Sequence, residues 1–575
     1  MEKKYINLRE ILVGFVFMVL FAIIFARALQ VQVYEGPWLS KKASDQYAKS
    51  FTSYGRRGII YDRNFREMAV SIEVTSIAAY PRQIKDAKAT ARTLATTLKM
   101  NFKDVLQKLT VDKKFVWIKR HSTPKESAAV KALQLDGIGF IPESNRFYPN
   151  TTLAAQALGF TGLDGDGLEG IEFFYDRYLK AENSNYTVIK DALGTGFKAE
   201  TAPVALTRGN NLVLTIDSNI QFISESTLQE TVDTFSARSG MAIVMQPKTG
   251  AILALAHYPF FNPNSYTDFD KELWRNRIIT DPFEPGSTMK IFSAAAAIES
   301  GTTTPHTIFY CENGAYRIGK NVVHDNTRHG WLSLQQIIKY SSNIGAVKVS
   351  EKVGAKQLYK SFRNFGFGEK TRIDCPGETA GSLTYYARWS DIDIGAISFG
   401  HGIAVSALQL IRAVSAIAND GILMKPYIVQ AVTDYHGKSL KTFKPLEVRR
   451  AIAAQTAICV RNIMKTVITK GGTGVKAALE GYTVSGKTGT ARKIDENGTY
   501  SEKKHIASFV GFTPSENPQI AILVIIDEPQ TKFFGGIVAA PAFKKIAQDT
   551  LNYLGIPPKN ISDKLRVAKD SETLG

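Results

Sequence analysis

The chain has 575 residues, of which 44% are hydrophobic and 22% charged, an ordinary globular composition that excludes a mainly disordered, collagenous or coiled-coil protein. Lysine and arginine outnumber aspartate and glutamate 71 to 53, and this excess of 18 positive charges suits nucleic acid, anionic lipid or an acidic polymer without choosing among them. At roughly 150 residues per domain, the length predicts two to four domains. Cys311, Cys375 and Cys459 are too few and too scattered for a disulfide scaffold or a thiolate metal site.

An apolar run near the N-terminus predicts a single membrane anchor. Residues 11–26 contain no charged or amide side chain, and Arg27 can snorkel to the headgroups, which extends the span to about twenty residues. Basic residues precede the run, so the positive-inside rule leaves residues 1–10 in the cytoplasm and sends the rest outside. A cleaved signal peptide is the alternative, because Ala26-Arg27-Ala28 imitates a cleavage site. The arginine inside that site and the length of the run favour an anchor over residues 11–33.

The segment from residue 34 to residue 215 is mixed in character. Short β-like runs such as residues 72–79 alternate with helical patches such as residues 91–98, and prolines interrupt both. We expect an elongated α+β pedestal with little chemistry of its own.

A denser pattern of elements begins near residue 216. The expected elements are strands at residues 211–217, 241–245 and 251–256, a helix over residues 218–235, long helical stretches, and strands again between residues 482 and 527. Strands at both ends with helices between them predict one domain over residues 216–555, in which a sheet joins the two extremities. Residues 556–575 are mostly charged and polar and predict a C-terminal tail.

The strongest local signal for chemistry is a serine followed three residues later by a lysine. Pro285-Gly286 ends a loop and an alanine-rich run follows, so Ser287 is expected at a helix start with Lys290 on the same face. A buried lysine that has lost its proton can activate a serine hydroxyl, and the helix dipole favours both the alkoxide and the neutral amine. By itself this pattern is far more often a helix cap beside a solvated lysine.

Two further motifs change those odds. Ser341-Ser342-Asn343 follows a helical segment at residues 334–340 and supplies a second hydroxyl and an amide. Lys487-Thr488-Gly489-Thr490 follows a β-branched run, and Asn497-Gly498 beyond it is a hairpin signal, so this motif is expected on a strand of an antiparallel pair. Its glycine would let a substrate backbone lie alongside the strand, and its lysine and hydroxyls would offer partners for a carboxylate.

The combination of S-x-x-K, S-x-N and K-T-G in this order is far more specific than its parts. With it, the sequence resembles the class B penicillin-binding proteins, which are membrane-anchored peptidoglycan D,D-transpeptidases. The resemblance runs from about residue 57 to residue 547 and includes Arg57-Gly58-Ile59-Ile60-Tyr61-Asp62-Arg63-Asn64, Arg146-Phe147-Tyr148-Pro149, Gly167-Leu168-Glu169-Gly170-Ile171-Glu172, Arg275-Asn276-Arg277 and Gly400-His401-Gly402-Ile403. Phe65 and His401 depart from the family, which usually has glycine and often glutamine there, and neither departure affects the catalytic set.

The resemblance implies an architecture and a first reaction step. The implied fold is α+β and multidomain, with a transpeptidase domain like that of the serine β-lactamases, in which helices flank an antiparallel sheet. Ser287 would attack the carbonyl between two terminal D-alanines of a stem peptide, with neutral Lys290 as general base. Ser341 would pass a proton to the leaving nitrogen, and Asn343 would hold the peptide amide.

The same resemblance implies how the rest of the site works. The backbone N–H groups of Ser287 and Thr490 would form the oxyanion hole. Lys487, with Thr488, Gly489 and Thr490, would bind the terminal carboxylate, and its charge would help keep the general base neutral. An amine from a neighbouring stem peptide would then resolve the ester, and β-lactams would block that step by acylating the serine.

The resemblance also implies partners and a location. The expected partners are stem peptides and their lipid-linked precursor, β-lactams, a membrane glycan polymerase and division proteins, with the catalytic domain on the outer face of the cytoplasmic membrane. The run from Arg146 to Asp191 looks more like the division-specific subgroup, which predicts septal synthesis. An elongation-specific transpeptidase, a β-lactamase or D,D-carboxypeptidase with the same residues, and a catalytically silent scaffold remain alternatives.

A P-loop ATPase is the rival from another mechanistic class. Residues 481–488 fit G-x-x-x-x-G-K-[ST], and Asp527 ends a Walker B-like run. A P-loop needs a strand before its glycines and a helix at its lysine, whereas β-branched residues occupy this loop and a hairpin signal follows. We expect no cofactor, no metal and no nucleic acid, because the eight histidines include no H-E-x-x-H pair and no nucleic-acid motif occurs.

Overall fold

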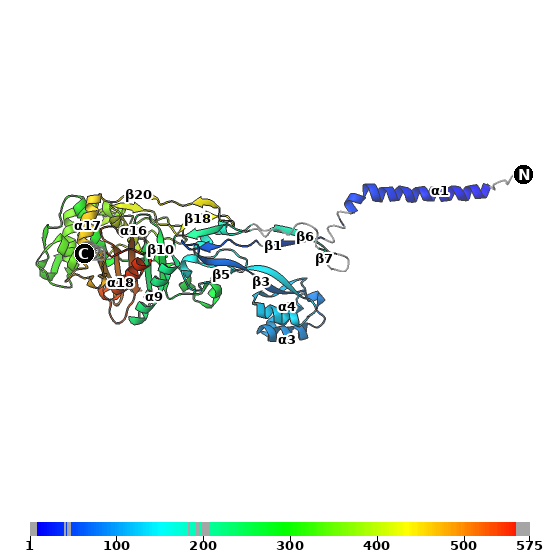
Figure 1. Ribbon diagram of the computed structural model, residues 1–575, viewed down its shortest axis with the longest axis horizontal. Coiled ribbons are helices and arrows are strands. Elements are labelled where there is room, and N and C mark those ends of the chain that lie inside the picture. The colour runs from blue at the N-terminus through cyan, green and yellow to red at the C-terminus, as the bar shows by residue number, and fades with distance from the viewer. Residues whose placement is uncertain are drawn as a thin grey trace, which may run out of the picture. The chain divides into compact units, whose positions relative to one another are not determined.

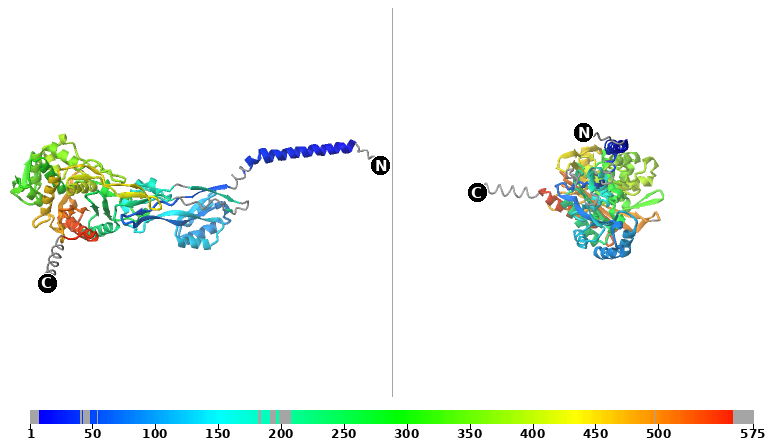
Figure 2. Two further views of the ribbon diagram at one scale, coloured as in Figure 1. Left: turned by 45° about the horizontal axis from the view of Figure 1, so that its top comes forward. Right: turned by 90° about the vertical axis from the view of Figure 1, so that its right-hand side faces the viewer.

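Figure 1 and Figure 2 show the computed structural model, in which the described residues are 8–39, 42, 48–53, 55–181, 184–190, 196–197, 208–495 and 497–558. The chain forms two compact units. The first comprises residues 1–56 and 181–208, and the second comprises residues 57–180 and 209–575. The predicted tail over residues 556–575 lies almost entirely outside the described residues.

The first unit contains an apolar helix and a small sheet. Helix α1 spans Leu8–Leu29 and continues as a π-helical segment over Gln30–Tyr34. With 27 residues and a mean hydropathy of 2.6, Leu8–Tyr34 is the one helix in the described part of the chain that is long and apolar enough to cross a membrane. An apolar helix therefore forms where the sequence predicts the anchor. Strands β1 (Ala48–Ser53), β6 (Ser184–Lys190) and β7 (Gly196–Phe197) form a three-stranded antiparallel sheet.

The core of the second unit is a five-stranded antiparallel sheet in the order β10-β9-β23-β22-β21. Its strands are β9 (Ser239–Met245), β10 (Ile252–Tyr258), β21 (Ser485–Ile494), β22 (Tyr500–Thr513) and β23 (Ile520–Asp527). Strand β9 pairs with β23, so the sheet joins the two ends of the C-terminal region, as expected from the sequence. The turn at Asn497-Gly498 joins β21 to β22, which confirms the predicted hairpin.

Many helices of the C-terminal region surround this sheet. The longer ones are α9 (Ser218–Thr234), α11 (Lys290–Glu299), α12 (Leu334–Tyr340), α13 (Asn343–Val353), α14 (Ala355–Asn364), α15 (Asp391–Ser398), α16 (Ala407–Ala418), α17 (Ala454–Thr466) and α18 (Gly535–Tyr553). Helices α3 (Ala87–Leu98), α4 (Phe102–Thr110) and α5 (Pro124–Ala132) pack instead against strands of the pedestal. Short helices and strand pairs connect them: α6 (Ala155–Leu158), α7 (Gly170–Phe174), α8 (Asp176–Leu179), α10 (Arg277–Thr280), β11 (Pro282–Phe283) with β16 (Val405–Ser406), β12 (Ile308–Tyr310) with β15 (Trp331–Ser333), β13 (Ala315–Ile318) with β14 (Asn321–His324), and β17 (Ile422–Met424) with β20 (Glu447–Arg450).

Helices cover both faces of the five-stranded sheet, which explains why β23 is apolar at almost every position. Successive side chains of a strand point to opposite faces. Leu523 packs in the cluster that contains the residues of α11 and α16, and its neighbour Val524 packs in the cluster formed with α9 and α18. The run that imitates a Walker B strand is therefore the central, doubly covered strand of an antiparallel sheet.

The predicted pedestal is built on a second sheet in the order β19-β18-β8-β2-β3-β4, with β5 also paired to β3. Its strands are β2 (Ile60–Tyr61), β3 (Glu67–Ala79), β4 (Val116–Ser122), β5 (Ile138–Phe147), β8 (Asn211–Leu214), β18 (Val429–Thr433) and β19 (Ser439–Thr442). The predicted strand at residues 72–79 and helix at residues 91–98 lie within β3 and α3 (Figure 1). That β18 and β19 complete this sheet beside β8 was not predicted, because nothing local in their sequence indicates a partner so far away.

A buried carboxylate joins the motifs of the pedestal. Glu172 is fully buried and lies 2.6 Å from Nε of both Arg57 and Arg146. Burial would raise its pKa, but the two guanidiniums outweigh burial and hold the pKa of Glu172 below its ordinary value. Asp62 accepts hydrogen bonds from the backbone N–H and the hydroxyl of Ser218 at the start of α9. Glu172 therefore joins motifs within the pedestal, and Asp62 fastens the pedestal to the C-terminal region.

Candidate active site

Ser287 and Lys290 lie on one face of a helical turn, as their spacing predicts. Residues Gly286–Met289 form a 3-10 turn that runs directly into α11. Nζ of Lys290 lies 3.1 Å from Oγ of Ser287. Gly286 has a φ of 55°, and a Cβ there would lie 2.8 Å from the carbonyl oxygen of Thr490, so the approach of this turn to β21 favours glycine.

Lys290 is fully buried among uncharged oxygen atoms. Its Nζ lies 2.6 Å from the carbonyl oxygen of Ser341, 2.7 Å from Oδ1 of Asn343 and 3.3 Å from Oγ of Ser341. A neutral amine has two N–H groups for the two nearest oxygens and one lone pair for the hydroxyl of Ser287. Burial lowers the pKa of Lys290 to about 7, against an opposing effect of the Asp325 carboxylate. A large fraction of Lys290 is therefore neutral at neutral pH.

The S-x-N motif forms the turn between α12 and α13. Ser341 has a φ of 61°, in the left-handed region, and this conformation ends α12. Asn343 begins α13, and its Nδ2 donates a hydrogen bond of 2.8 Å to the carbonyl oxygen of His324. That bond turns Oδ1 of Asn343 toward Lys290. The structure thus brings both motif residues to the lysine.

Asp325 holds this turn in position, and it is absent from the residues predicted from the sequence. One carboxylate oxygen accepts a hydrogen bond of 2.6 Å from the hydroxyl of Ser342. The other accepts from the backbone N–H of Asn343 and, at 3.0 Å, from that of Ile344. Asp325 lies in a polar stretch well before the motif, and no fixed spacing connects the two, so the sequence carries no signal for it.

Lys487 approaches the site from β21. It is fully buried, and its Nζ lies 2.9 Å from Oγ of Ser341, which is also near Lys290. Burial, together with the charge of Lys290, lowers the pKa of Lys487 well below its ordinary value. Two ammonium groups around one hydroxyl would repel each other, which disfavours the state in which both lysines are charged. Burial alone lowers the pKa of Lys290, so the expectation that the charge of Lys487 helps keep this base neutral is wrong.

The other residues of the K-T-G-T motif divide between the two faces of β21. Thr488 and Thr490 line the cleft, whereas Gly489 is buried on the opposite face. A Cβ at Gly489 would collide with Oγ of Ser508 and with Cγ2 of Thr288. Glycine is therefore needed at this position for a different reason from the one expected. It allows β21 to pack closely against its neighbours, rather than allowing a substrate to approach.

A cleft of about 820 Å³ contains the site. Its lining includes Ser287, Ser341, Asn343, Thr488 and Thr490, which come from three separate segments of the chain. The predicted site residues that reach the cleft are thus on one surface, with the two lysines buried beneath it.

The rim of the cleft is held by a carboxylate just before the serine. Glu284 accepts a hydrogen bond of 2.8 Å from the backbone N–H of Gly402 and bonds of 3.1 Å from the hydroxyl of Tyr500. Burial, and then the Glu284 carboxylate, raises the pKa of Tyr500 to about 12. The ring of His401 lies 5.1 Å from that of Tyr500. Of these residues, Tyr500 was not singled out in the sequence.

The P-loop interpretation fails on geometry. Lys487 lies inside β21, and no helix begins there, so the P-loop arrangement is not formed. Within the part of the chain that the structure describes, no three His, Cys, Asp or Glu side chains gather as metal ligands. The three cysteines are free, and Cys311 and Cys375 are buried.

Comparison with known proteins identifies the family. Residues 240–548 match the penicillin binding protein transpeptidase domain, and residues 52–214 match the penicillin-binding protein dimerisation domain. The chain belongs to the penicillin-binding protein transpeptidase family. The two matched ranges fall within the domains expected at residues 216–555 and 34–215, whose outer boundaries stay predictions.

Named relatives cover nearly the whole of this penicillin-binding protein. It is 36% identical over 546 residues to the probable peptidoglycan D,D-transpeptidase PenA of Neisseria meningitidis, covering 94% of this chain and 92% of that one. It is 32% identical to the peptidoglycan D,D-transpeptidase FtsI of Escherichia coli K12, covering 93% and 90%. Penicillin binding protein 3 of Mycobacterium tuberculosis, solved with aztreonam, is similar with a TM-score of 0.69 and 27% identity, covering 88% of this chain and 99% of that one.

Proposed function

We propose that this protein is a peptidoglycan D,D-transpeptidase that crosslinks stem peptides through an acyl-enzyme on Ser287. The observation that carries this proposal is the hydroxyl of Ser287 at 3.1 Å from a fully buried lysine amine whose pKa is lowered to about 7. Membership of the penicillin-binding protein family and the names of the relatives support it.

Acylation begins with the transfer of a proton. Nζ of Lys290 takes the hydroxyl proton as Oγ of Ser287 attacks the carbonyl carbon between the two terminal D-alanines. The carbonyl oxygen becomes an oxyanion, and the backbone N–H groups of Ser287 and Thr490 would stabilise it, each contributing about 3 to 4 kcal/mol. The C–N bond then breaks, and the terminal D-alanine leaves.

The leaving nitrogen needs a proton, and Ser341 has the position to supply it. Its Oγ lies 3.3 Å from Nζ of Lys290 and 2.9 Å from Nζ of Lys487, so a proton held by either lysine can pass through this hydroxyl. Asn343 uses one N–H of Nδ2 for the carbonyl of His324 and keeps the other for a substrate amide. Its Oδ1 meanwhile positions Lys290 at 2.7 Å.

The terminal carboxylate would bind at the opposite wall of the cleft. Thr490 accepts a hydrogen bond of 3.1 Å from the backbone N–H of Gly535, which leaves its own hydroxyl proton for the substrate. Thr488 lines the same wall, and Nζ of Lys487 behind it lies 3.3 Å from its hydroxyl oxygen and helps to position it. After the D-alanine has left, an amine of a second stem peptide attacks the ester and closes the crosslink. β-Lactams imitate the dipeptide and acylate Ser287 in the same way.

Intact-mass spectrometry after penicillin treatment tests the proposal. We expect one covalent adduct, mapped by peptide digestion to Ser287. The Ser287→Ala variant should form none, whereas Ser439→Ala, an exposed serine outside the cleft, should form the wild-type adduct. An adduct at another residue, or none at all, would reject the mechanism. An adduct that hydrolyses within seconds would indicate a β-lactamase instead.

We also propose a cellular setting for this activity. Leu8–Tyr34 would anchor the chain by a single span with the catalytic domain outside the cytoplasmic membrane, and septal synthesis beside a glycan polymerase and division proteins would be its role. The apolar helix and the relative named FtsI support this setting. Fluorescent penicillin labelling with imaging of growing cells tests it, and signal along the side wall instead of the septum would favour the elongation role.

A further inference from the structure

The acceptor amine has to lose two protons, and the groups around Ser287 account for one of them. An aliphatic amine is an ammonium at neutral pH, and it becomes an amide only after two N–H bonds have broken. One proton can return to Oγ of Ser287 through Ser341 and Lys290, which is the acylation route in reverse. The other must leave before attack, because an ammonium has no lone pair. Lys290 is fully buried, so a group in the cleft is better placed to take this proton.

His401 lies beside the segment that carries the reactive serine. The carbonyl oxygen of Gly400 accepts a hydrogen bond of 3.3 Å from the backbone N–H of Gly286. The backbone N–H of Gly402 donates a hydrogen bond of 2.8 Å to Glu284. Both chain neighbours of His401 are therefore bonded to the residues just before the serine, and His401 itself lines the same cleft as that serine.

The ring of His401 is held in place, but its nitrogens are free. The ring lies 5.3 Å from that of Phe399 and 5.1 Å from that of Tyr500. Within the part of the chain that the structure describes, neither ring nitrogen makes a hydrogen bond, and the side chain is partly exposed. A neutral imidazole in this position offers a lone pair to a molecule in the cleft.

The surroundings of His401 keep its imidazole neutral. Burial lowers the pKa of His401, the Glu284 carboxylate opposes this effect, and the charges of Lys290 and Arg492 add to it. Tyr500 also faces the ring and carries no charge, because its pKa is raised to about 12. His401 is therefore in its proton-accepting form at neutral pH.

One acidic side chain lines the cleft, and it is on the same wall. Among the described lining residues, Glu502 is the only aspartate or glutamate. It follows Tyr500 by two residues on β22, so both side chains point to the same face of that strand. Glu502 is exposed and forms no ion pair with the described residues. Its charge attracts an ammonium to the wall on which His401 lies.

We propose that His401 accepts the first proton of the acceptor ammonium and that Glu502 draws the ammonium to it. This role rests on the proposed function, since it concerns the amine that resolves the acyl-enzyme. One N–H bond breaks, its electron pair stays on nitrogen, and the proton goes to a ring nitrogen of His401. The amine then attacks the ester carbonyl carbon. Its second proton passes through Ser341 and Lys290 to Oγ of Ser287 as the C–O bond breaks, and the imidazolium gives its proton to water.

Acyl transfer to two matched acceptors tests this assignment. The full-length protein in detergent receives an N-acyl-D-alanyl thioester as donor, and mass spectrometry quantifies the transfer products. The first acceptor is N-acetylated L-alanyl-γ-D-glutamyl-L-lysine, whose side chain is an ammonium at neutral pH. The second carries an aminooxy group, O–NH₂, in place of the terminal CH₂–NH₂. This weakly basic nitrogen is already neutral, so it needs no proton acceptor before it attacks.

Three variants separate a proton acceptor from a residue that only shapes the cleft. His401→Gln introduces the residue that the family often has there, which is polar but takes up no proton. It should lower transfer to the lysine acceptor about 10²-fold or more relative to transfer to the aminooxy acceptor. Glu502→Gln should raise the KM for the lysine acceptor about threefold, with a smaller effect on the aminooxy acceptor. His306→Gln changes an exposed histidine outside the cleft lining and should keep the wild-type ratio.

The penicillin adduct of each variant shows that it is folded. Equal losses with the two acceptors in His401→Gln would overturn the assignment, because His401 would then only shape the cleft. An unchanged rate with the lysine acceptor would also overturn it, since another group would take the proton. An unchanged KM in Glu502→Gln would reject the part that concerns Glu502. A wild-type protein that forms no penicillin adduct, or that passes the acyl group only to water, would instead refute the proposed function.

Discussion

The lowered pKa of Lys290 predicts how acylation depends on pH. Burial moves this pKa from 10.5 to about 7. At pH 7 about half of such a lysine is neutral, whereas an ordinary lysine is neutral in about 1 molecule in 3,000, so burial supplies roughly a 10³-fold gain in available base. The neutral form is the active one, and it is the form that accumulates as pH rises through 7. The second-order rate of acylation should therefore rise about tenfold between pH 6 and pH 8 and then level off.

A substitution of Lys290 itself also tests its role as the general base. Lys290→Arg keeps the positive charge but removes the base, since a guanidinium does not lose its proton, and acylation should fall by about 10² to 10⁴. Lys465→Arg, a partly exposed lysine that pairs with Glu516, is the matched control and should retain the wild-type rate.

Stopped-flow measurement with a fluorescent penicillin gives these rates across the pH range. Because burial, and not the charge of Lys487, lowers the pKa of Lys290, Lys487→Met should leave the midpoint of the pH profile near 7. A rate that is flat from pH 6 to pH 8, or a Lys290→Arg variant within tenfold of the wild type, would refute the assignment of Lys290 as the base.

Three further substitutions probe positions that the catalytic mechanism depends on indirectly. Asp325→Ala removes the hydrogen-bond acceptor that holds the S-x-N turn, so the rate of acylation should fall about tenfold or more while the Tm is largely retained. An unchanged rate would show that the turn does not depend on Asp325. Glu172→Gln leaves two buried guanidiniums without their carboxylate and should lower the free energy of unfolding by about 3 to 5 kcal/mol, which thermal denaturation would detect. A Tm equal to that of the wild type would contradict a stabilising role of these ion pairs. Gly489→Ala should lower the free energy of unfolding by about 1 to 3 kcal/mol, because the new Cβ collides with Oγ of Ser508. Ser508→Ala in the same chain should restore part of that stability, and the absence of any recovery would show that this collision is not the cause.

Local sequence patterns predict the elements of this protein well where burial follows a simple rule. The run before Asp527 is apolar because both faces of its strand are covered, and a continuous apolar run of that length indicates a buried strand. The Asn497-Gly498 turn likewise predicts its hairpin from two residues. By contrast, β18 joins the pedestal sheet through backbone pairing with β8, and β19 pairs in turn with β18, and neither pairing leaves a mark on the sequence of these strands.

The candidate site divides in the same way. The spacing of Ser287 and Lys290 predicts their contact, because three residues make about one helical turn. Nothing local predicts that Ser341 and Lys487 meet them, and only the resemblance to a known family connects these segments before the fold is seen. Asp325 escapes both approaches, because it acts through the backbone of the S-x-N turn and belongs to none of the motifs.

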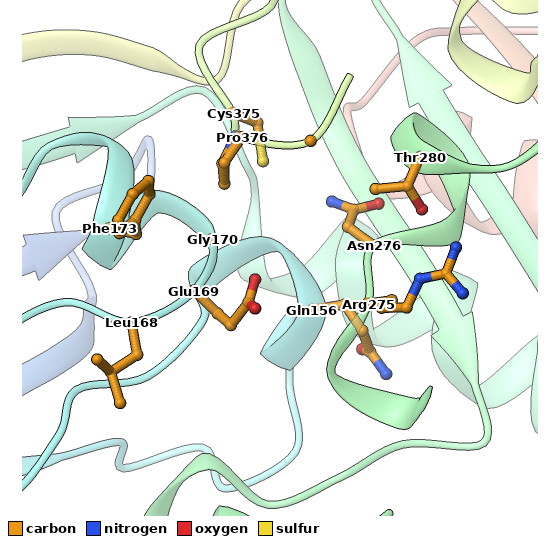
Figure 3. Close-up of a pocket in the computed structure, with 11 residues that line it drawn as sticks. Gln156, Leu168, Glu169, Gly170, Phe173, Arg275, Asn276, Thr280, Cys375 and Pro376 are labelled. Carbon is orange, nitrogen blue, oxygen red and sulfur yellow. The ribbon is translucent and has the colours of Figure 1, made fainter. Parts of the chain in front are cut away.

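The motifs that carry the family resemblance do different work in the fold. Arg57, Arg146 and Glu172 come from three of them, and they meet in one buried ion pair network outside the lining of the cleft, so their residue types follow from the need to neutralise a buried charge. The Arg275-Asn276-Arg277 motif, the first two residues of which are drawn in Figure 3, follows the same rule in the C-terminal region. Arg275 pairs with Asp281, and Arg277 pairs with Asp527 at the end of β23. A buried carboxylate therefore accounts for the residue types of this motif as well.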